Sequence, residues 1–249
     1  MRKTKCAPAK KSNHIAKYKP WLQIKKQPIR KKKPAPYMIH DTFFEKAKKE
    51  WYRARSVYKL KEIQEQYWLI EPHMSICDIG AAPGSFMQYI NRITDKTNLL
   101  IGIDIKAIDK FSQKNIQTLQ HSIFDFDTLK PKVENIFYEF SKSETGLIWN
   151  QSQDWDYTFD LIVSDIAPNT TGRKDVDQFA SVELNIEILK FAEVFLKQWW
   201  NLLLKVFKGE DFWDLTREVK KYFDRFTEYK PLACRDRSFE TYLICFSKK

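Results

Sequence analysis

A short loop of small residues, Asp78 to Phe86, is the first segment whose residue types could bind a ligand. It reads DIGAAPGSF, follows an apolar run and precedes a helical pattern, and its glycines let the backbone approach a ligand closely. Asp104 lies twenty residues beyond Gly84, where a carboxylate can accept both hydroxyls of a ribose. A dinucleotide loop would carry a further glycine, so the spacing favours a nucleoside that bears an amino acid over a pyrophosphate. An ordinary strand-to-helix turn is the alternative.

The elements that must position this loop alternate along the chain. Apolar runs predict strands, and apolar residues at helical spacing predict helices. The expected strands are 75–80, 98–105, 159–167, 202–208 and 240–246, and the expected helices are 177–198 and 211–226. Continuous apolar strands that alternate with amphipathic helices indicate an α/β fold, with a mostly parallel sheet covered by helices on both faces.

Three further segments complete the expected organisation. Thr42 to Glu45 fits a capping box, which predicts that a helix begins there, and a second helix is expected near Ser56. Residues 127–157 are polar and are predicted to form a long surface connection. With 249 residues, the chain has room for one sizeable α/β domain.

The net positive charge of the chain is concentrated at its N-terminus. Residues 1–40 contain thirteen Lys or Arg and no Asp or Glu, whereas the remaining 209 residues hold 30 basic and 32 acidic groups. Such a segment attracts polyanions by counterion release, and Tyr18 and Trp21 could stack on bases. We predict a basic, disordered RNA-binding arm over 1–40, with a solvating tail as the alternative.

The remaining composition excludes several classes of protein. No run of about 18 apolar residues could cross a membrane, and the basic N-terminus lacks the apolar stretch of a secretory signal. The four cysteines and four histidines are scattered, so neither a disulfide framework nor a metal site is expected. These features predict a cytoplasmic protein that binds neither a membrane nor a metal.

Four motifs, in order along residues 42–249, resemble those of a known family. YRARSVYKL (52–60), DIGAAPGSF (78–86), SDIAPN (164–169) and KVFKGE (205–210) are similar to the FtsJ/RrmJ-type (RlmE-like) ribosomal RNA 2′-O-methyltransferases. The resemblance implies that residues 41–249 form a methyltransferase domain of the class I, Rossmann-like fold, with a seven-stranded sheet and S-adenosyl-L-methionine bound at the strand ends. It also implies a monomer.

The resemblance further implies a catalytic tetrad of Lys59, Asp165, Lys205 and Glu240. Lys205 would be the general base that takes the proton of a ribose 2′-hydroxyl. Asp165 would orient Lys205, and Glu240 would position Lys59. Alone, a lysine at a strand end is usually just solvated and an Asp before Ile-Ala-Pro is usually a turn residue, so the hypothesis depends on all four together.

The implied cofactor contacts are Gly80, Gly84, Phe86, Asp104 and Asp165. One departure concerns the acidic residue that the family usually carries near the end of the third strand, in contact with adenine. Ser122 stands at the most natural alignment and Asp125 follows three residues later. Either could contact the base.

The expected substrate is a ribose, by resemblance that of a uridine, in the RNA of the large ribosomal subunit. A tRNA or mRNA-cap ribose methyltransferase would carry the same tetrad. A non-catalytic ribosome-assembly factor that retains the fold is an alternative of a different class, although a pure binder has no need of Lys205 opposite Asp165. A dehydrogenase is disfavoured by the missing glycine of the loop.

The tryptophans form an unusual pattern. The chain has eight tryptophans and only six glycines, and four tryptophans stand where the resemblance leads us to expect glycine: Trp51, Trp68, Trp199 and Trp200. Our hypothesis is that these positions are glycines encoded by recoded UGA codons. The alternative is that they are genuine tryptophans in the core or stacked on RNA.

Overall fold

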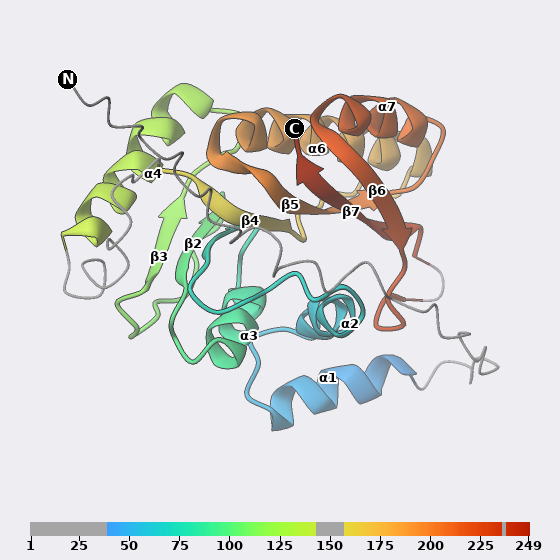
Figure 1. Ribbon diagram of the computed structural model, residues 1–249. Helices are drawn as coiled ribbons and strands as arrows, with labels where there is room; N and C mark the ends of the chain where they lie inside the picture. The colour runs from blue at the N-terminus through green and yellow to red at the C-terminus, as the bar shows by residue number, and fades with distance from the viewer. Residues whose placement is uncertain (1–38, 143–156, 236–237) are drawn as a thin grey trace, which may run out of the picture. The chain divides into compact units, whose positions relative to one another are not determined.

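The computed structural model describes residues 39–142, 157–235 and 238–249, and in this described part seven strands form one sheet (Figure 1). Their order across the sheet is β3-β2-β1-β4-β5-β7-β6. The strands are β1 Ser75–Ile79, β2 Leu99–Asp104, β3 Ile116–Gln120, β4 Phe159–Ser164, β5 Leu196–Phe207, β6 Phe223–Tyr229 and β7 Glu240–Lys248.

The sheet is mostly parallel, as the sequence predicted. Strands β3, β2, β1, β4 and β5 are paired in parallel, whereas β7 runs antiparallel to both β5 and β6. The reversed direction of β7 places its first residue, Glu240, opposite Phe207 near the carboxyl end of β5. The first residue of β7 therefore lies at the same edge of the sheet as the carboxyl ends of the parallel strands.

Helices cover both faces of the sheet (Figure 1). On one side lie α2 (Val57–Tyr67) and α3 (Ser85–Ile93), with α1 (Ile39–Lys49) next to them, and on the other lie α4 (Phe126–Ser141), α6 (Lys174–Phe195) and α7 (Phe212–Tyr222). Two hydrophobic clusters fill the two interfaces. Because both faces are covered, the central strands are buried at every position and mostly apolar, which explains why each was visible as an apolar run.

The prediction of a polar surface connection over 127–157 was wrong for the first half of that range. Residues 126–141 form α4, which buries Leu129, Val133, Phe137 and Phe140 against the sheet. These residues are spaced by four, four and three, which is a helical period. Pro131 inside the helix and the polar residues on its outer face hid that period. Residues 143–156 lie outside the described residues.

Three predicted helix boundaries also need correction. The helix expected over 177–198 spans Lys174–Phe195 as α6, and residues 196–198 belong to β5. The helix expected over 211–226 ends at Tyr222, because the residues from Phe223 onward pair with β7 as strand β6. The first helix begins at Ile39 and not at the expected capping box. Packing stabilises this helix, because Ala47 is buried in a hydrophobic cluster and Phe43 packs against the same cluster. The second helix follows Ser56, as expected.

The predicted arm, residues 1–40, lies outside the described residues except for its last two, which begin α1. Across the residues that the structure describes, no helix is long and apolar enough to cross a membrane.

Three of the four questioned tryptophans hold a left-handed backbone. Trp51, Trp68 and Trp199 have φ values of 61°, 53° and 70°, and their side chains are exposed. Trp51 follows α1 and Trp68 ends α2, both positions where glycine is preferred. Trp199 lies where the pairing of β4 with β5 is irregular. Trp200 is not among the residues with positive φ, and it packs against the core.

A left-handed backbone alone does not identify a glycine. Among the residues that the structure describes, five other non-glycine residues have positive φ: His73, Asp95, Lys96, Tyr157 and Ser247. Asp and His tolerate this region better than a bulky side chain such as tryptophan does. Exposure also matters, because a tryptophan that gains no burial has nothing to offset the cost of its backbone conformation, about 1–2 kcal/mol.

We therefore predict that Trp51→Gly, Trp68→Gly and Trp199→Gly each raise the free energy of unfolding by about 1 kcal/mol, because glycine adopts positive φ without steric cost. Urea denaturation measures the change. Trp213→Gly is the matched control: Trp213 is exposed too but lies in α7, so glycine should not stabilise there. Equal effects at all four positions would contradict the backbone argument.

The recoding hypothesis makes a separate prediction about the gene and the native protein. Codons 51, 68, 199 and 200 should be UGA, and peptides of the protein from its own cells should have the masses of glycine at these positions. UGG codons at these positions would disprove the hypothesis.

Candidate active site

Four charged side chains meet at the carboxyl edge of the parallel strands. Asp165 directly follows β4, Lys205 lies near the end of β5, and Glu240 begins β7. Lys59 reaches the same place from α2. These are the four residues of the expected tetrad, and the fold brings all of them together from separate parts of the chain.

The Asp165 carboxylate lies between the two lysines. Its Oδ1 atom is 3.1 Å from Lys205 Nζ and 3.6 Å from Lys59 Nζ. Lys205 Nζ also donates a hydrogen bond to the Asp165 carbonyl oxygen, at 2.5 Å. Lys59 Nζ lies 3.1 Å from both carboxylate oxygens of Glu240. Two cations and two anions therefore form one nearly buried cluster.

Burial and charge act in opposite directions in this cluster. Burial favours the neutral form of Asp165, but the ammonium groups of Lys205 and Lys59 outweigh it and hold the pKa of Asp165 below its ordinary value. Burial likewise disfavours the charge of Lys59, yet Asp165 and Glu240 together raise the pKa of that lysine. The cluster therefore keeps Asp165 ionised and Lys59 protonated.

Sequence reasoning missed one member of this site. The Tyr242 hydroxyl donates a hydrogen bond to Asp165 Oδ1 at 2.5 Å, from the strand β7 that also carries Glu240. Burial, followed by the charge of Asp165, raises the pKa of Tyr242 well above its ordinary value, so the hydroxyl keeps its proton and remains a donor. A signal was available: Glu240 and Tyr242 are two residues apart in a strand and so point to the same face.

The predicted nucleoside loop lies beside this cluster. Gly80 follows β1 with a φ of 79°, and a Cβ atom there would meet the Ile166 backbone at 2.8 Å. Only glycine fits so close an approach. Gly84, with a φ of 102°, immediately precedes α3. At the end of β2, Asp104 accepts hydrogen bonds from the Ala82 and Lys106 backbone N–H groups, and this holds its carboxylate against the loop.

Asp78, at the fourth position of β1, is buried without a partner. Neither of its carboxylate oxygens has a hydrogen bond to any residue that the structure describes. Burial raises the pKa of Asp78 well above its ordinary value, and the charges of Asp165 and Asp104 act in the same direction. An unpaired buried carboxyl group is costly, and a cationic ligand beside Asp78 would favour its ionised form and offset that cost.

The other expected contacts have local roles. Phe86 is buried in the hydrophobic cluster that α2 and α3 form with the sheet. Ser122 Oγ accepts a hydrogen bond from the Phe124 backbone N–H, and Asp125 Oδ2 accepts one from Thr128 Oγ1 at the start of α4. Within the described ranges, no group of three or more His, Cys, Asp or Glu residues could hold a metal ion.

The sheet order, with β7 inserted antiparallel between β5 and β6, and a site at the strand ends define a class I methyltransferase fold. The chain belongs to the FtsJ-like methyltransferase family, whose model matches residues 52–248. The resemblance seen in the four sequence motifs is therefore confirmed.

Curated relatives agree with this assignment. The chain is 32% identical to the ribosomal RNA large subunit methyltransferase E of Desulfatibacillum aliphaticivorans, over 89% of this chain and 97% of the relative. It is 37% identical to the protein of the same name from Acinetobacter baylyi, over 85% and 88% of the two chains. A crystal structure described as a ribosomal RNA methyltransferase of Plasmodium falciparum matches with a TM-score of 0.65 and 28% identity, over 79% and 98%.

The charge cluster should be thermodynamically coupled. Lys59→Met should lower the free energy of unfolding by about 3 kcal/mol, because it leaves Glu240 and Asp165 with one buried cation fewer. Combining it with Glu240→Gln should cost less than the sum of the single changes, which urea denaturation can measure. Lys190→Met, at an exposed pair with Glu187, should change stability by less than about 1 kcal/mol. Additive effects of Lys59→Met and Glu240→Gln would contradict the coupling.

Proposed function

We propose that this protein transfers a methyl group from S-adenosyl-L-methionine to the 2′-hydroxyl of a ribose, that of a uridine, in 23S RNA of the large ribosomal subunit. The observation that carries the proposal is the Lys205–Asp165 pair, held beside Lys59 and Glu240 at the strand ends. The family assignment supports methyl transfer, and the names of the curated relatives support the RNA substrate.

The residues at this edge fit the proposed cofactor. Its ammonium and sulfonium groups are cationic, and Asp78, Asp104 and Asp165 supply carboxylates around the nucleoside loop. Asp104 would receive the ribose hydroxyls, and the backbone at Gly80 and Gly84 leaves room for close approach. Exposed apolar side chains follow two strand ends: Ile105 after β2 and Phe124 after β3. These side chains offer an apolar surface to the adenine ring.

When bound, S-adenosyl-L-methionine supplies a methyl group that its sulfonium already activates. The protein must therefore orient the ribose oxygen in line with that methyl group and accept the hydroxyl proton. We assign the proton to Lys205 Nζ, which must first release the proton of its ammonium form to solvent so that a lone pair is free to accept that of the hydroxyl. Asp165 then holds the resulting ammonium group through Oδ1 and its carbonyl oxygen.

The charges of the cluster suit this proton transfer. With Lys205 protonated, the two lysines balance Asp165 and Glu240, so the cluster is formally neutral after the proton arrives. Lys59 and the Tyr242 hydroxyl keep the Asp165 carboxylate in place throughout. In this proposal Lys205 is the general base, and Asp165, Lys59 and Glu240 position and balance it.

Binding of the RNA would draw on the basic N-terminal segment. Its thirteen Lys and Arg residues can contact phosphates, while the shape of the RNA would select the nucleotide. Because the proposed substrate is ribosomal RNA, we place the reaction in the cytoplasm.

The test is incubation with tritiated S-adenosyl-L-methionine and large ribosomal subunits from a strain that lacks its own enzyme of this type. We expect label at one uridine ribose, and Lys205→Ala should lower the rate by about a hundredfold or more because the proton acceptor is lost. Lys190→Ala, which removes an exposed lysine of α6, should keep the rate.

Other outcomes would change the proposal in defined ways. Label on tRNA and not on ribosomal RNA would overturn the substrate and keep the chemistry. RNA binding without methyl transfer, equal in the wild-type protein and Lys205→Ala, would indicate an assembly factor.

A further inference from the structure

The guanidinium group of Arg53 connects two loops at the carboxyl ends of the strands. These are residues 80–84, after β1, and residues 105–111, after β2, which together we call the nucleoside edge. Its Nη1 atom donates hydrogen bonds to the carbonyl oxygens of Pro83, at 3.0 Å, and of Asp109, at 2.9 Å. Its Nη2 atom donates to the Lys110 carbonyl oxygen at 3.0 Å. Pro83 belongs to the loop after β1, and the other two residues belong to the segment after β2 that begins just beyond Asp104.

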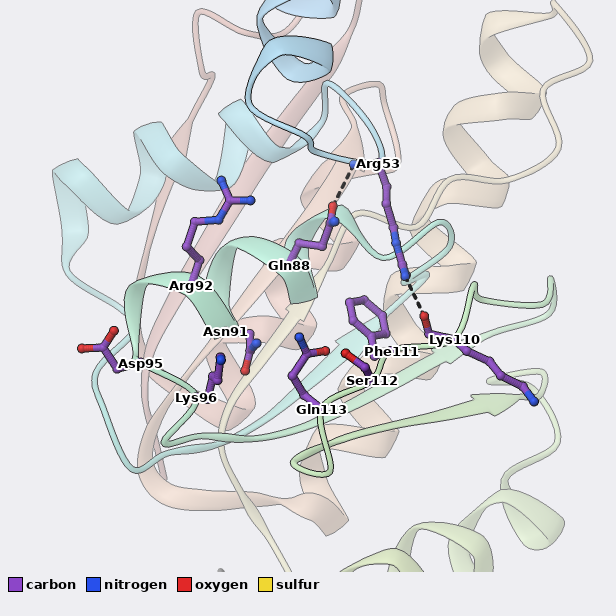
Figure 2. A pocket seen from close by; sticks show the side chains of 10 residues that line it. All are labelled: Arg53, Gln88, Asn91, Arg92, Asp95, Lys96, Lys110, Phe111, Ser112 and Gln113. Atoms are coloured by element: carbon purple, nitrogen blue, oxygen red, sulfur yellow. Dashed lines mark hydrogen bonds between the residues drawn. The ribbon is translucent and has the colours of Figure 1, made fainter.

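Two more contacts fix the position of Arg53. The guanidinium carbon lies 3.8 Å from the centre of the Phe111 ring, a stacking geometry. The Arg53 backbone N–H donates to Gln88 Oε1 at 2.7 Å, which ties the residue to α3 (Figure 2). Figure 2 shows the Arg53 side chain reaching down past Gln88 toward Lys110, with Phe111 beside it.

Gly84 makes room for this arrangement. A Cβ atom on Gly84 would lie 2.6 Å from Arg53 Nη1 and 2.8 Å from Phe111 Cζ, so any other residue would displace these side chains and would also be strained at a φ of 102°. The loop glycine therefore serves Arg53 and Phe111 as well as a ligand. The packing of these three residues joins the loop after β1 to the segment after β2.

We propose that Arg53 is a positioning residue for the cofactor, which holds the Pro83–Gly84 turn and the 105–111 segment at a fixed separation. This inference rests on the proposed function, since it assumes that S-adenosyl-L-methionine binds between these loops. The binding free energy would otherwise be reduced by the cost of ordering both loops.

This role differs from the RNA contact that a basic residue in the YRARS segment first suggests. Three hydrogen bonds to carbonyl oxygens and a ring on one face already occupy most of the Arg53 guanidinium. A lysine could not replace it, because a single ammonium group on a flexible stem cannot bridge three separate carbonyl oxygens and stack on a ring.

Arg92 is a matched control. It lines the same pocket of about 610 Å³ as Arg53, on the outer side of α3 (Figure 2). Its guanidinium stacks on Tyr52 at 4.4 Å and donates to the Glu50 carbonyl oxygen. These contacts involve neither loop of the nucleoside edge, so Arg92→Ala removes the same charge without releasing the loops.

The experiment measures S-adenosylhomocysteine affinity by calorimetry, RNA affinity by filter binding, and KM and kcat for methyl transfer. Arg53→Ala and Arg53→Lys should each weaken cofactor affinity and raise its KM by about tenfold, with RNA affinity changed less than twofold. Arg92→Ala should leave cofactor affinity within twofold of the wild type.

Arg53 faces an open pocket, so truncation leaves no sealed cavity, and thermal unfolding checks that the variants fold. Should Arg53→Ala fail to fold, Phe111→Leu removes the stacked ring alone and should weaken cofactor affinity about threefold.

Unchanged cofactor affinity with weakened RNA affinity in Arg53→Ala would overturn the inference and return Arg53 to RNA binding. Equal losses of cofactor affinity in Arg53→Ala and Arg92→Ala would also overturn it, because charge and not loop geometry would then be the cause. If the wild-type protein itself bound no cofactor, the proposed function would fail first, and this inference with it.

Discussion

Two lysine ammonium groups share one buried carboxylate, that of Asp165, and the geometry of the site depends on this sharing. Desolvation of four charges is costly, and removing any one of them leaves the others unbalanced. The cost is offset because each lysine lies about 3.1 Å from a carboxylate oxygen and the Tyr242 hydroxyl donates a further hydrogen bond to Asp165 Oδ1. The general-base chemistry that we propose for Lys205 would give these buried charges a use.

The topology of the sheet makes the cluster possible. Parallel strands place Asp165 and Lys205 at one edge, but Glu240 comes from a strand that would bring it to the opposite edge if it ran parallel. The antiparallel direction of β7 turns its first residue toward the site and also presents Tyr242 on the same face. Lys59 then completes the cluster from α2, whose buried side packs on the sheet.

The nucleoside edge depends on a different constraint, which is close packing between loops. Gly80 admits the Ile166 backbone, and Gly84 admits Arg53 and Phe111. These glycines and Arg53 join the loops after β1, β2 and β4 into one surface around Asp78 and Asp104. The charge cluster and the nucleoside edge meet at Asp165, so a ligand at the edge would lie next to the proposed proton acceptor.

The sequence by itself determined the class of the fold and the identity of the four clustered residues. Strands such as β1 and β4 are buried at every position and therefore mostly apolar, and that pattern survives in a single sequence. The sequence did not reveal α4, because Pro131 and polar residues lie between its buried residues. Nor did it reveal β6, which becomes a strand only through pairing with β7. The sequence raises the suspicion of a left-handed backbone at Trp51, Trp68 and Trp199, and the structure shows it in their φ values. Tertiary structure alone decided the roles of Tyr242 and Arg53, because a hydrogen bond between residues 77 positions apart, or to a carbonyl oxygen 57 positions away, leaves no local pattern in the chain.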